Sequence, residues 1–233
     1  MKLILLFITL LFSLLVQQVE AQISVNDVIV HFKAAERPLQ NIIVKNSAKE
    51  VFYVTATVEE LTEPSEDKSP LLVTEDLIVS PKKFSIDANS ERVVRLLSRK
   101  THDNKERVYR VSFVPQEKEF GEPLEGASGD RKTMIRVITG MGVLVFIDPI
   151  NPKPELKWVR TPDSVIFTNS GNQHTRLSEG KACDSEDVGC TDLPSRRVYG
   201  GKDYTVSVPA NKTIYYTRRD GPSGDFKSIV VAP

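Results

Sequence analysis

Residues 133–147 read TMIRVITGMGVLVFI, and no other stretch says as much about the fold of this chain. An antiparallel strand with one face in water alternates apolar and polar residues. Here the odd positions are apolar or threonine throughout. The even positions are also apolar, except at Arg136, Gly140 and Gly142. The pattern therefore predicts a strand with two apolar faces.

Two arrangements explain a strand of this kind. It can be a central strand that another layer or domain covers, or an edge strand whose second face is reserved for a partner chain. An exposed strand of the second kind promotes aggregation unless it is occupied or protected. Donated to the incomplete sheet of another protein, it would supply ladder hydrogen bonds and alternate side chains. The sequence alone leaves both arrangements open.

The N-terminal half around this stretch also predicts strands. Short apolar or alternating runs are separated by polar turns such as those at 46–49 and 87–90. No apolar stripe with helical spacing occurs, so we expect little helix. Seven strands at this spacing are typical of an immunoglobulin-like sandwich. The expected strands are 23–32, 40–45, 51–59, 71–79, 92–97, 108–114 and 133–147.

A proline-rich segment follows directly. Residues 148–154 read DPINPKP, with three prolines in seven positions. Such a segment is stiff and extended and cannot donate ladder hydrogen bonds at its prolines. We place the domain boundary there, between an N-terminal domain at 22–148 and a C-terminal domain at 149–233. The second domain has seven expected strands, at 157–160, 164–169, 174–177, 196–199, 204–208, 213–217 and 229–232.

The N-terminus has the pattern of a secretory signal peptide at 1–21. Lys2 precedes an apolar run at 3–16, and the small-x-small step 19–21 precedes Gln22. The run is too short to cross a hydrocarbon core of about 30 Å. We expect cleavage near Ala21–Gln22 and an exported protein that is not inserted in the membrane.

Composition and motifs exclude several classes of function. The 31 basic and 31 acidic side chains leave the chain neutral, without an electrostatic footprint for nucleic acid. No nucleophile elbow, zinc-protease motif or phosphate loop occurs, and residues 140–142 lack the third glycine of a dinucleotide site. His102 and Asp103 resemble half of a catalytic triad, but no activated serine can be named. We expect neither an enzyme nor a cofactor.

Cys183 and Cys190 enclose a polar six-residue insert. In an oxidising compartment the pair predicts a local disulfide that closes an eight-residue ring. The alternatives are a metal site and a reactive thiol. His31, His102 and His174 are not spaced as metal ligands, and the acidic neighbours of the cysteines disfavour a reactive thiolate. We therefore predict the disulfide and no metal site.

Five stretches of the chain, taken in order, carry a family pattern. They are LIVSP at 77–81, FSIDANS at 84–90, VVRL at 93–96, KERVYRVSF at 105–113 and MGVLVFIDP at 141–149. In this order they resemble successive strands and turns of periplasmic pilus chaperones. The resemblance spans 22–233 and is closest to the alternate branch, which serves colonisation-factor and common-pilus fimbriae. That branch has a Cys-containing loop similar to 183–190.

The resemblance implies two immunoglobulin-like β-sandwich domains in a boomerang arrangement, with a cleft between them. It implies a non-enzymatic periplasmic chaperone that caps pilus subunits with its last N-domain strand and delivers them to an outer-membrane usher. The free protein could also cap itself as a dimer. Matched back from Pro149, the residues expected to face the subunit are Ile135, Val137, Thr139, Met141 and Val143. The opposite parity would fill the core of the chaperone.

Two charged positions depart from the family pattern. The best-known branch grips the C-terminal carboxylate of the subunit with Arg on the first strand and Lys on the last. Here the first strand has no basic residue and the lysine position is Leu144. Arg110 or Arg95 could supply the charge from a neighbouring strand, unless both lie on solvated faces. Glu106 matches a position that forms an ion pair across the domain interface, but the usual basic partner is Asp148, so that pair must be rebuilt or absent.

A second class of function remains open from the sequence. A secreted two-domain immunoglobulin-like adhesion or binding module would contain residues 133–147 simply as a core strand. A hydrolase is a distant third interpretation.

Overall fold

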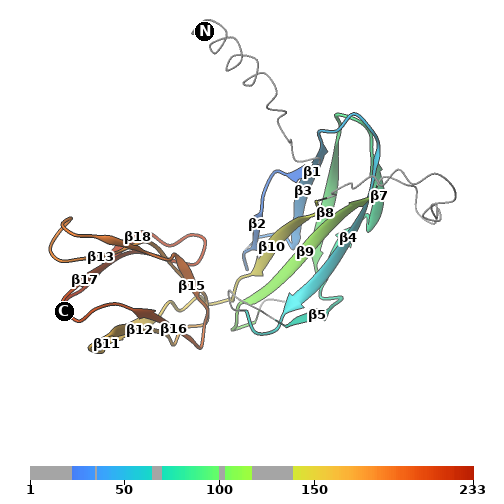
Figure 1. Ribbon diagram of the computed structural model, residues 1–233. Coiled ribbons are helices and arrows are strands. Elements are labelled where there is room, and N and C mark those ends of the chain that lie inside the picture. The colour runs from blue at the N-terminus through green and yellow to red at the C-terminus, as the bar shows by residue number, and fades with distance from the viewer. Residues whose placement is uncertain (1–22, 35, 65–69, 100–102, 117–138) are drawn as a thin grey trace, which may run out of the picture.

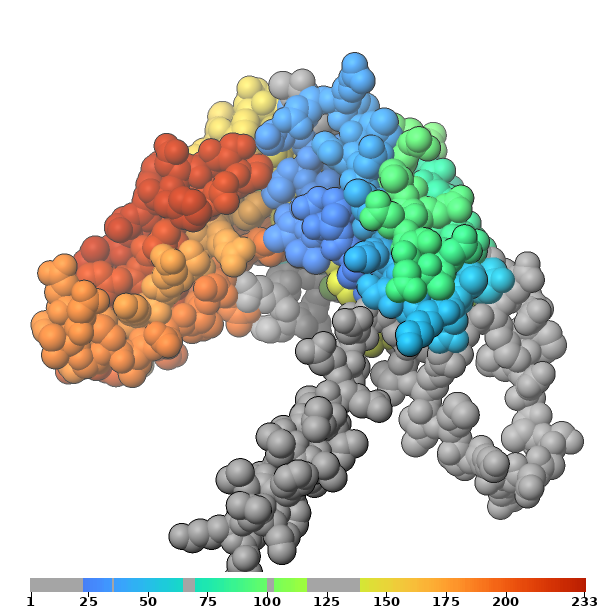
Figure 2. Space-filling model, turned by 90° about the horizontal axis from the view of Figure 1, so that it is seen from above, coloured from blue at the N-terminus to red at the C-terminus, as the bar shows by residue number. Residues whose placement is uncertain are grey.

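The computed structural model describes residues 23–34, 36–64, 70–99, 103–116 and 139–233. These residues form strands in two lobes set at an angle to one another (Figure 1), and the same bend is visible from above (Figure 2). Within them no helix reaches the length and hydropathy needed to cross a membrane. The expected signal peptide, together with His102, Ile135 and Val137, lies outside the described residues.

The first lobe is a sandwich of two sheets. Sheet 1 has the strand order β1–β3–β8–β6, and sheet 2 has the order β2–β10–β9–β4–β5, with β7 also paired to β4. Every pairing is antiparallel except that of β2 with β10, which is parallel. The bounds are β1 Ile23–Val25, β2 Ile29–Phe32, β3 Leu39–Asn46, β4 Phe52–Leu61, β5 Leu71–Val73, β6 Leu77–Ser80, β7 Lys83–Ile86, β8 Glu91–Ser98, β9 Arg107–Gln116 and β10 Met141–Ile147.

The second lobe is a smaller sandwich. Sheet 3 has the order β11–β12–β16, and sheet 4 has the order β14–β13–β17–β18, with β15 also paired to β13. The bounds are β11 Leu156–Arg160, β12 Ser164–Asn169, β13 Thr175–Cys183, β14 Thr191–Leu193, β15 Arg196–Val198, β16 Lys202–Ser207, β17 Thr213–Asp220 and β18 Phe226–Val231. The prediction of two immunoglobulin-like β-sandwich domains is confirmed. We propose the domain boundary between β10 and β11, where the sequence placed it.

Each lobe has its own apolar core, built by period-two patterns. On β8, for example, Val94 and Leu96 are buried while Val93, Arg95 and Leu97 are exposed. A fully buried aliphatic or aromatic side chain contributes about 1.5–3 kcal/mol. Large buried side chains of the first core include Phe32, Phe52, Tyr109 and Phe113, and those of the second include Phe167, Leu177, Ile214 and Tyr216.

Two expected strands are each divided between the two sheets of the first lobe. The expected strand 23–32 breaks after Val25, so that β1 pairs in sheet 1 and β2 in sheet 2. The expected strand 71–79 likewise divides into β5 and β6, which belong to different sheets. In both places a short polar turn redirects the chain, and an apolar pattern continues on either side of it.

The disulfide predicted in the second lobe is present. Cys183 and Cys190 are bonded at the end of β13 and close a tight loop. The ammonium group of Lys212 donates to the carbonyl of Gly189 (2.7 Å) and lies 3.0 Å from Asp184, which ties the loop to the turn before β17.

Replacing both cysteines with serine is expected to lower the free energy of unfolding by about 2–3 kcal/mol, because the unfolded chain loses an eight-residue ring. Urea unfolding of the wild type and of the double variant measures the difference. Dithiothreitol should destabilise the wild type and leave the double variant unchanged. An equal effect of the reductant on both proteins would contradict the prediction.

Candidate functional site

β10 lies at the junction of the two lobes and is paired unevenly along its length. β9 pairs with the whole of β10, from Met141 to Ile147. β2 pairs only with its second half, from Leu144 to Ile147. Along Met141–Val143 no described strand pairs with the other edge of β10. The strand is therefore central next to the hinge and an edge strand at its beginning.

The two faces of β10 are oriented opposite to the expectation. Val143, Val145 and Ile147 are buried in the core of the first lobe, and Met141 packs against the same core. The expectation that Met141 and Val143 face a partner is thus wrong for this structure. The odd-numbered residues of β10 point into the core because of the pairing with β9, which places Val143 beside the core residue Val111. Thr139 is exposed and precedes the strand.

The other face of β10 points toward the second lobe. Phe146 is fully buried there with Leu61, Val108 and Tyr199, and the last of these comes from the second lobe. Leu144 packs at the margin of this cluster. Apolar side chains of β4, β9 and β10 therefore form a hydrophobic contact between the lobes. This contact accounts for one of the two apolar faces seen in the sequence.

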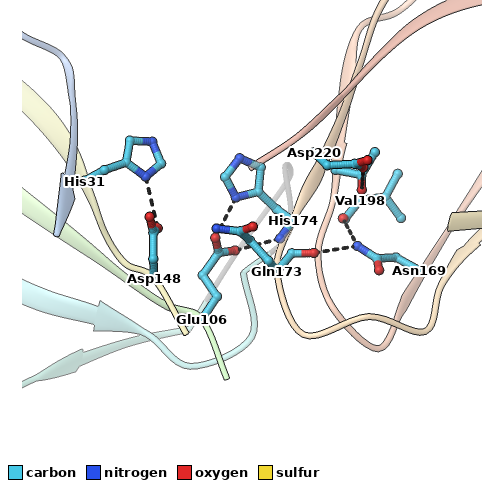
Figure 3. A network of polar contacts seen from close by, with 9 residues as sticks. His31, Glu106, Asp148, Asn169, Gln173, His174, Val198 and Asp220 are labelled. Atoms are coloured by element: carbon cyan, nitrogen blue, oxygen red, sulfur yellow. Dashed lines mark hydrogen bonds and ion pairs between the residues drawn. The ribbon is translucent and has the colours of Figure 1, made fainter. Parts of the chain in front are cut away.

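A polar network crosses the interface beside this cluster (Figure 3). The carboxylate of Glu106 accepts a hydrogen bond from the backbone N–H of His174 (3.1 Å) and contacts Nδ1 of the same residue (2.7 Å). Both side chains are buried. Asn169 positions the loop that carries His174, because its amide donates to the carbonyls of Gln173 (2.9 Å) and Val198 (2.7 Å).

The loop before His174 provides a second bridge. The side-chain amide of Asn172 donates to the carbonyls of Asn104 (2.8 Å) in the first lobe and Asn151 (2.9 Å) in the hinge. The carbonyl of Asn172 accepts from the backbone N–H of Glu106 (3.0 Å). One loop of the second lobe thus fixes both the entry to β9 and the connection after β10.

The second carboxylate of the interface also has a histidine partner. Oδ1 of Asp148 lies 3.2 Å from Nδ1 of His31 on β2. The ring of Phe146 is 4.8 Å from the ring of His31 and 4.8 Å from that of His174. At the position where the family pattern has an ion pair, Glu106 therefore contacts His174, while Asp148 contacts a different histidine.

A polar cavity of about 350 Å³ opens between the lobes, beside Glu106 and Tyr199. Arg107 at its wall lies 2.8 Å from Asp103 and 3.4 Å from Glu60, and the hydrogen bond to Asp103 raises the pKa of Arg107. Burial raises the pKa of the Tyr199 phenol, so this group stays neutral. Across the described residues, no group of three potential metal ligands occurs.

The two candidate arginines lie on different sheets. Arg110 is exposed on the outer face of sheet 2, directly across from Leu144 on one side and Glu59 on the other. Arg95 is exposed on β8, in sheet 1, which does not contain β10. Of the two, only Arg110 therefore lies beside the strand that the sequence marked as important.

Comparison with known proteins identifies the family. Residues 22–152 match the family described as pili and flagellar-assembly chaperone, PapD N-terminal domain. The chain belongs to this family and is a pilus chaperone of the chaperone–usher kind, as the sequence motifs suggested. This finding favours a chaperone over the alternative of an adhesion module. No curated protein sequence matches the chain.

Solved structures share the fold over nearly the whole chain. The class 5 fimbriae chaperone CfaA is 18% identical with a TM-score of 0.67, covering 90% of this chain and 97% of its own. The CupB2 chaperone of Pseudomonas aeruginosa is 13% identical with a TM-score of 0.61, covering 90% and 100%. A matched chain in the CsuC–CsuE chaperone–tip adhesion subunit complex of Acinetobacter baumannii is 15% identical with a TM-score of 0.60, and the match covers 91% of this chain and 99% of that chain.

Replacing Glu106 with alanine is expected to lower the free energy of unfolding by about 1–3 kcal/mol, because the buried backbone N–H of His174 loses its acceptor and the ring Nδ1 loses its partner. The lobes should also separate, which small-angle scattering would detect as a larger radius of gyration. Glu155→Ala is the control, since the Glu155–Lys157 pair is exposed and such pairs contribute little. Equal stability and equal dimensions of the two variants would contradict the assigned role of Glu106.

Val143→Asp tests the orientation of β10. An unpaired charge in the apolar core should destabilise the first lobe by about 3 kcal/mol or more. Gly142→Asp is the matched control, because a Cβ at Gly142 meets no atom within 4 Å. Circular dichroism during urea unfolding measures both. If the Val143→Asp protein is as stable as the wild type, Val143 does not belong to the core and faces a partner instead.

Proposed function

We propose that this protein is a non-enzymatic periplasmic chaperone that binds and caps pilus subunits by donating the beginning of β10 and the residues before it. The observation that carries the proposal is the uneven pairing of β10. Its hinge half is fixed between β2 and β9, while the edge along Met141–Val143 has no described partner strand. A strand of a subunit can add to that edge by ladder hydrogen bonds.

The proposed contact residues follow from the described geometry. Gly142 turns its open side away from the core, and a Cβ there would meet no atom within 4 Å. The regular alternation ends at Thr139 and Gly140, which are both exposed and precede the strand. Met141 and Val143 are omitted because they belong to the core of the first lobe. Thr139, which is exposed, and Ile135 and Val137, which match the family pattern, stay as the proposed subunit-facing residues.

Arg110 is the proposed anchor for the C-terminal carboxylate of a subunit. It is exposed on the outer face of sheet 2, one strand away from Leu144, where the family pattern has a lysine. Arginine binds a carboxylate with two parallel hydrogen bonds. Arg95 is not proposed, because it lies on the other sheet.

Several parts of the function come from the family. Delivery to an outer-membrane usher and self-capping as a dimer in the absence of subunits belong to the proposal on this ground. The complex of CsuE with the chaperone CsuC is a solved example of a chaperone with a tip adhesion subunit. Residence in the periplasm would follow from cleavage of the expected signal peptide near Ala21–Gln22.

Co-expression with pilus subunits from the same organism tests the function. Subunits should survive periplasmic proteases and co-purify only when this protein is present. Gly142→Arg should reduce recovery of the complex at least tenfold while the chaperone stays folded, because the new side chain occupies the open side of β10. Ser207→Arg, exposed on sheet 3, is the control. Subunits that are equally stable without the chaperone would exclude the proposed function.

A further inference from the structure

Two glycines lie at the beginning of β10, and the packing of this chain explains only the first of them. A Cβ on Gly140 would lie 2.9 Å from the carbonyl oxygen of Phe113, which is too close. A Cβ on Gly142 would meet no atom within 4 Å, and this residue does not have a positive φ either. Glycine inside a strand costs about 0.5–1 kcal/mol relative to alanine, and it often marks a place where another backbone or a ligand approaches closely. The glycine at position 142 therefore needs an explanation from outside this chain.

The backbone of Gly142 faces the open edge of β10. The N–H and C=O groups of successive residues in a strand point alternately to its two sides. The N–H of Leu144 donates to the carbonyl of Val28, on the side of β2. Gly142 has the same parity, but no described strand pairs with β10 on that side at this position. Along Met141–Val143, Gly142 is therefore the residue whose backbone groups point to an added strand.

Two apolar side chains flank Gly142 on the outer face of sheet 2. Leu144 follows it on β10 and is partly buried at the margin of the cluster between the lobes. On β9, Ser112 lies directly opposite Gly142, and Val114 follows on the same face with an exposed fraction of 53%. Because Gly142 and Ser112 are small, they form the floor of a recess between the two apolar side chains. We call these four residues the glycine recess.

We propose that a strand of the pilus subunit, added to the open edge of β10, places an aromatic side chain over the glycine recess. This inference rests on the proposed function and names the kind of side chain that the site selects. The subunit residue directly opposite Gly142 turns its side chain to the outer face, because directly opposite residues share a face. An aromatic side chain on a neighbouring strand can compensate for the packing that a glycine lacks.

The dimensions and the charge of the recess favour an aromatic ring. Diagonal neighbours on adjacent strands are about 7–8 Å apart, a distance that aromatic and long side chains can bridge. Such a ring can contact Leu144 diagonally and extend across Gly142 toward Ser112. A long basic side chain is disfavoured, because Arg110 lies directly across from Leu144. The apolar walls disfavour other long polar side chains, since burying a polar group without a partner is costly.

Substitutions of Gly142 in the full mature protein separate recognition from folding. Free Gly142→Ala and Gly142→Val should unfold at the same temperature as the wild type or above it, because a Cβ fits and the unfolded chain loses freedom. Their complexes with a pilus subunit should dissociate faster, at least threefold for alanine and at least tenfold for valine. Ser207→Val, exposed on sheet 3, is the control and should leave the dissociation rate unchanged.

A double-mutant cycle identifies the side chain that occupies the recess. Each aromatic residue of the subunit is replaced with alanine, and dissociation is measured from the wild-type chaperone and from Gly142→Val. One of these substitutions should accelerate dissociation at least tenfold from the wild type and less than twofold from Gly142→Val. Unchanged dissociation of the Gly142→Val complex, or coupling of Gly142 to no aromatic residue, would overturn the inference and leave the proposed function intact. A wild-type protein that forms no complex with any subunit would instead disprove the proposed function.

Discussion

The relation between the two domains depends on one buried carboxylate. A carboxylate that is withdrawn from water is costly unless hydrogen bonds replace its hydration. Glu106 is buried and receives both the backbone N–H and the ring nitrogen of His174. Its partners come from one loop, and Asn169 holds that loop by two further buried hydrogen bonds. The orientation of the second domain therefore depends on successive hydrogen bonds that connect Asn169, the loop of His174 and Glu106.

The interface combines this polar contact with an apolar one. Phe146 is buried against Tyr199 of the second domain and lies beside the rings of both His31 and His174. It belongs to β10, the strand whose other face fills the core of the first domain. Because one strand contributes to the core and to the domain contact, the hinge end of β10 cannot move without disturbing both. The beginning of the strand has no such double role.

Local patterns in the sequence were sufficient for much of the fold. The alternation on β8 and the cysteine pair each depend on neighbours in the sequence, and both predictions agree with the structure. The parity of β10 could not be obtained in this way. A strand that is apolar on both faces has no alternation to show which face is inside, and only its pairing with β9 decides this.

Other features of the site depend on contacts between distant residues. The family pattern pairs Glu106 with a basic residue at position 148, which is Asp148 in this chain, whereas the partner in the structure is His174 on the other domain. Arg197, Arg176 and Arg219 belong to three separate strands and become neighbours only through the register of sheet 4. The sequence does not distinguish Arg110 from Arg95 as a carboxylate anchor. In the structure they lie on different sheets, and only the sheet of Arg110 contains β10.

The early change of sheet between β1 and β2 has a consequence for any guest strand. β2 runs parallel to β10 and occupies its edge from Leu144 onward, where the N–H of Leu144 donates to the carbonyl of Val28. A subunit strand that binds β10 as proposed would have to end where β2 begins. On the proposed function, the position of the crossing at Asn26 and Asp27 would thus limit the length and the register of the added strand.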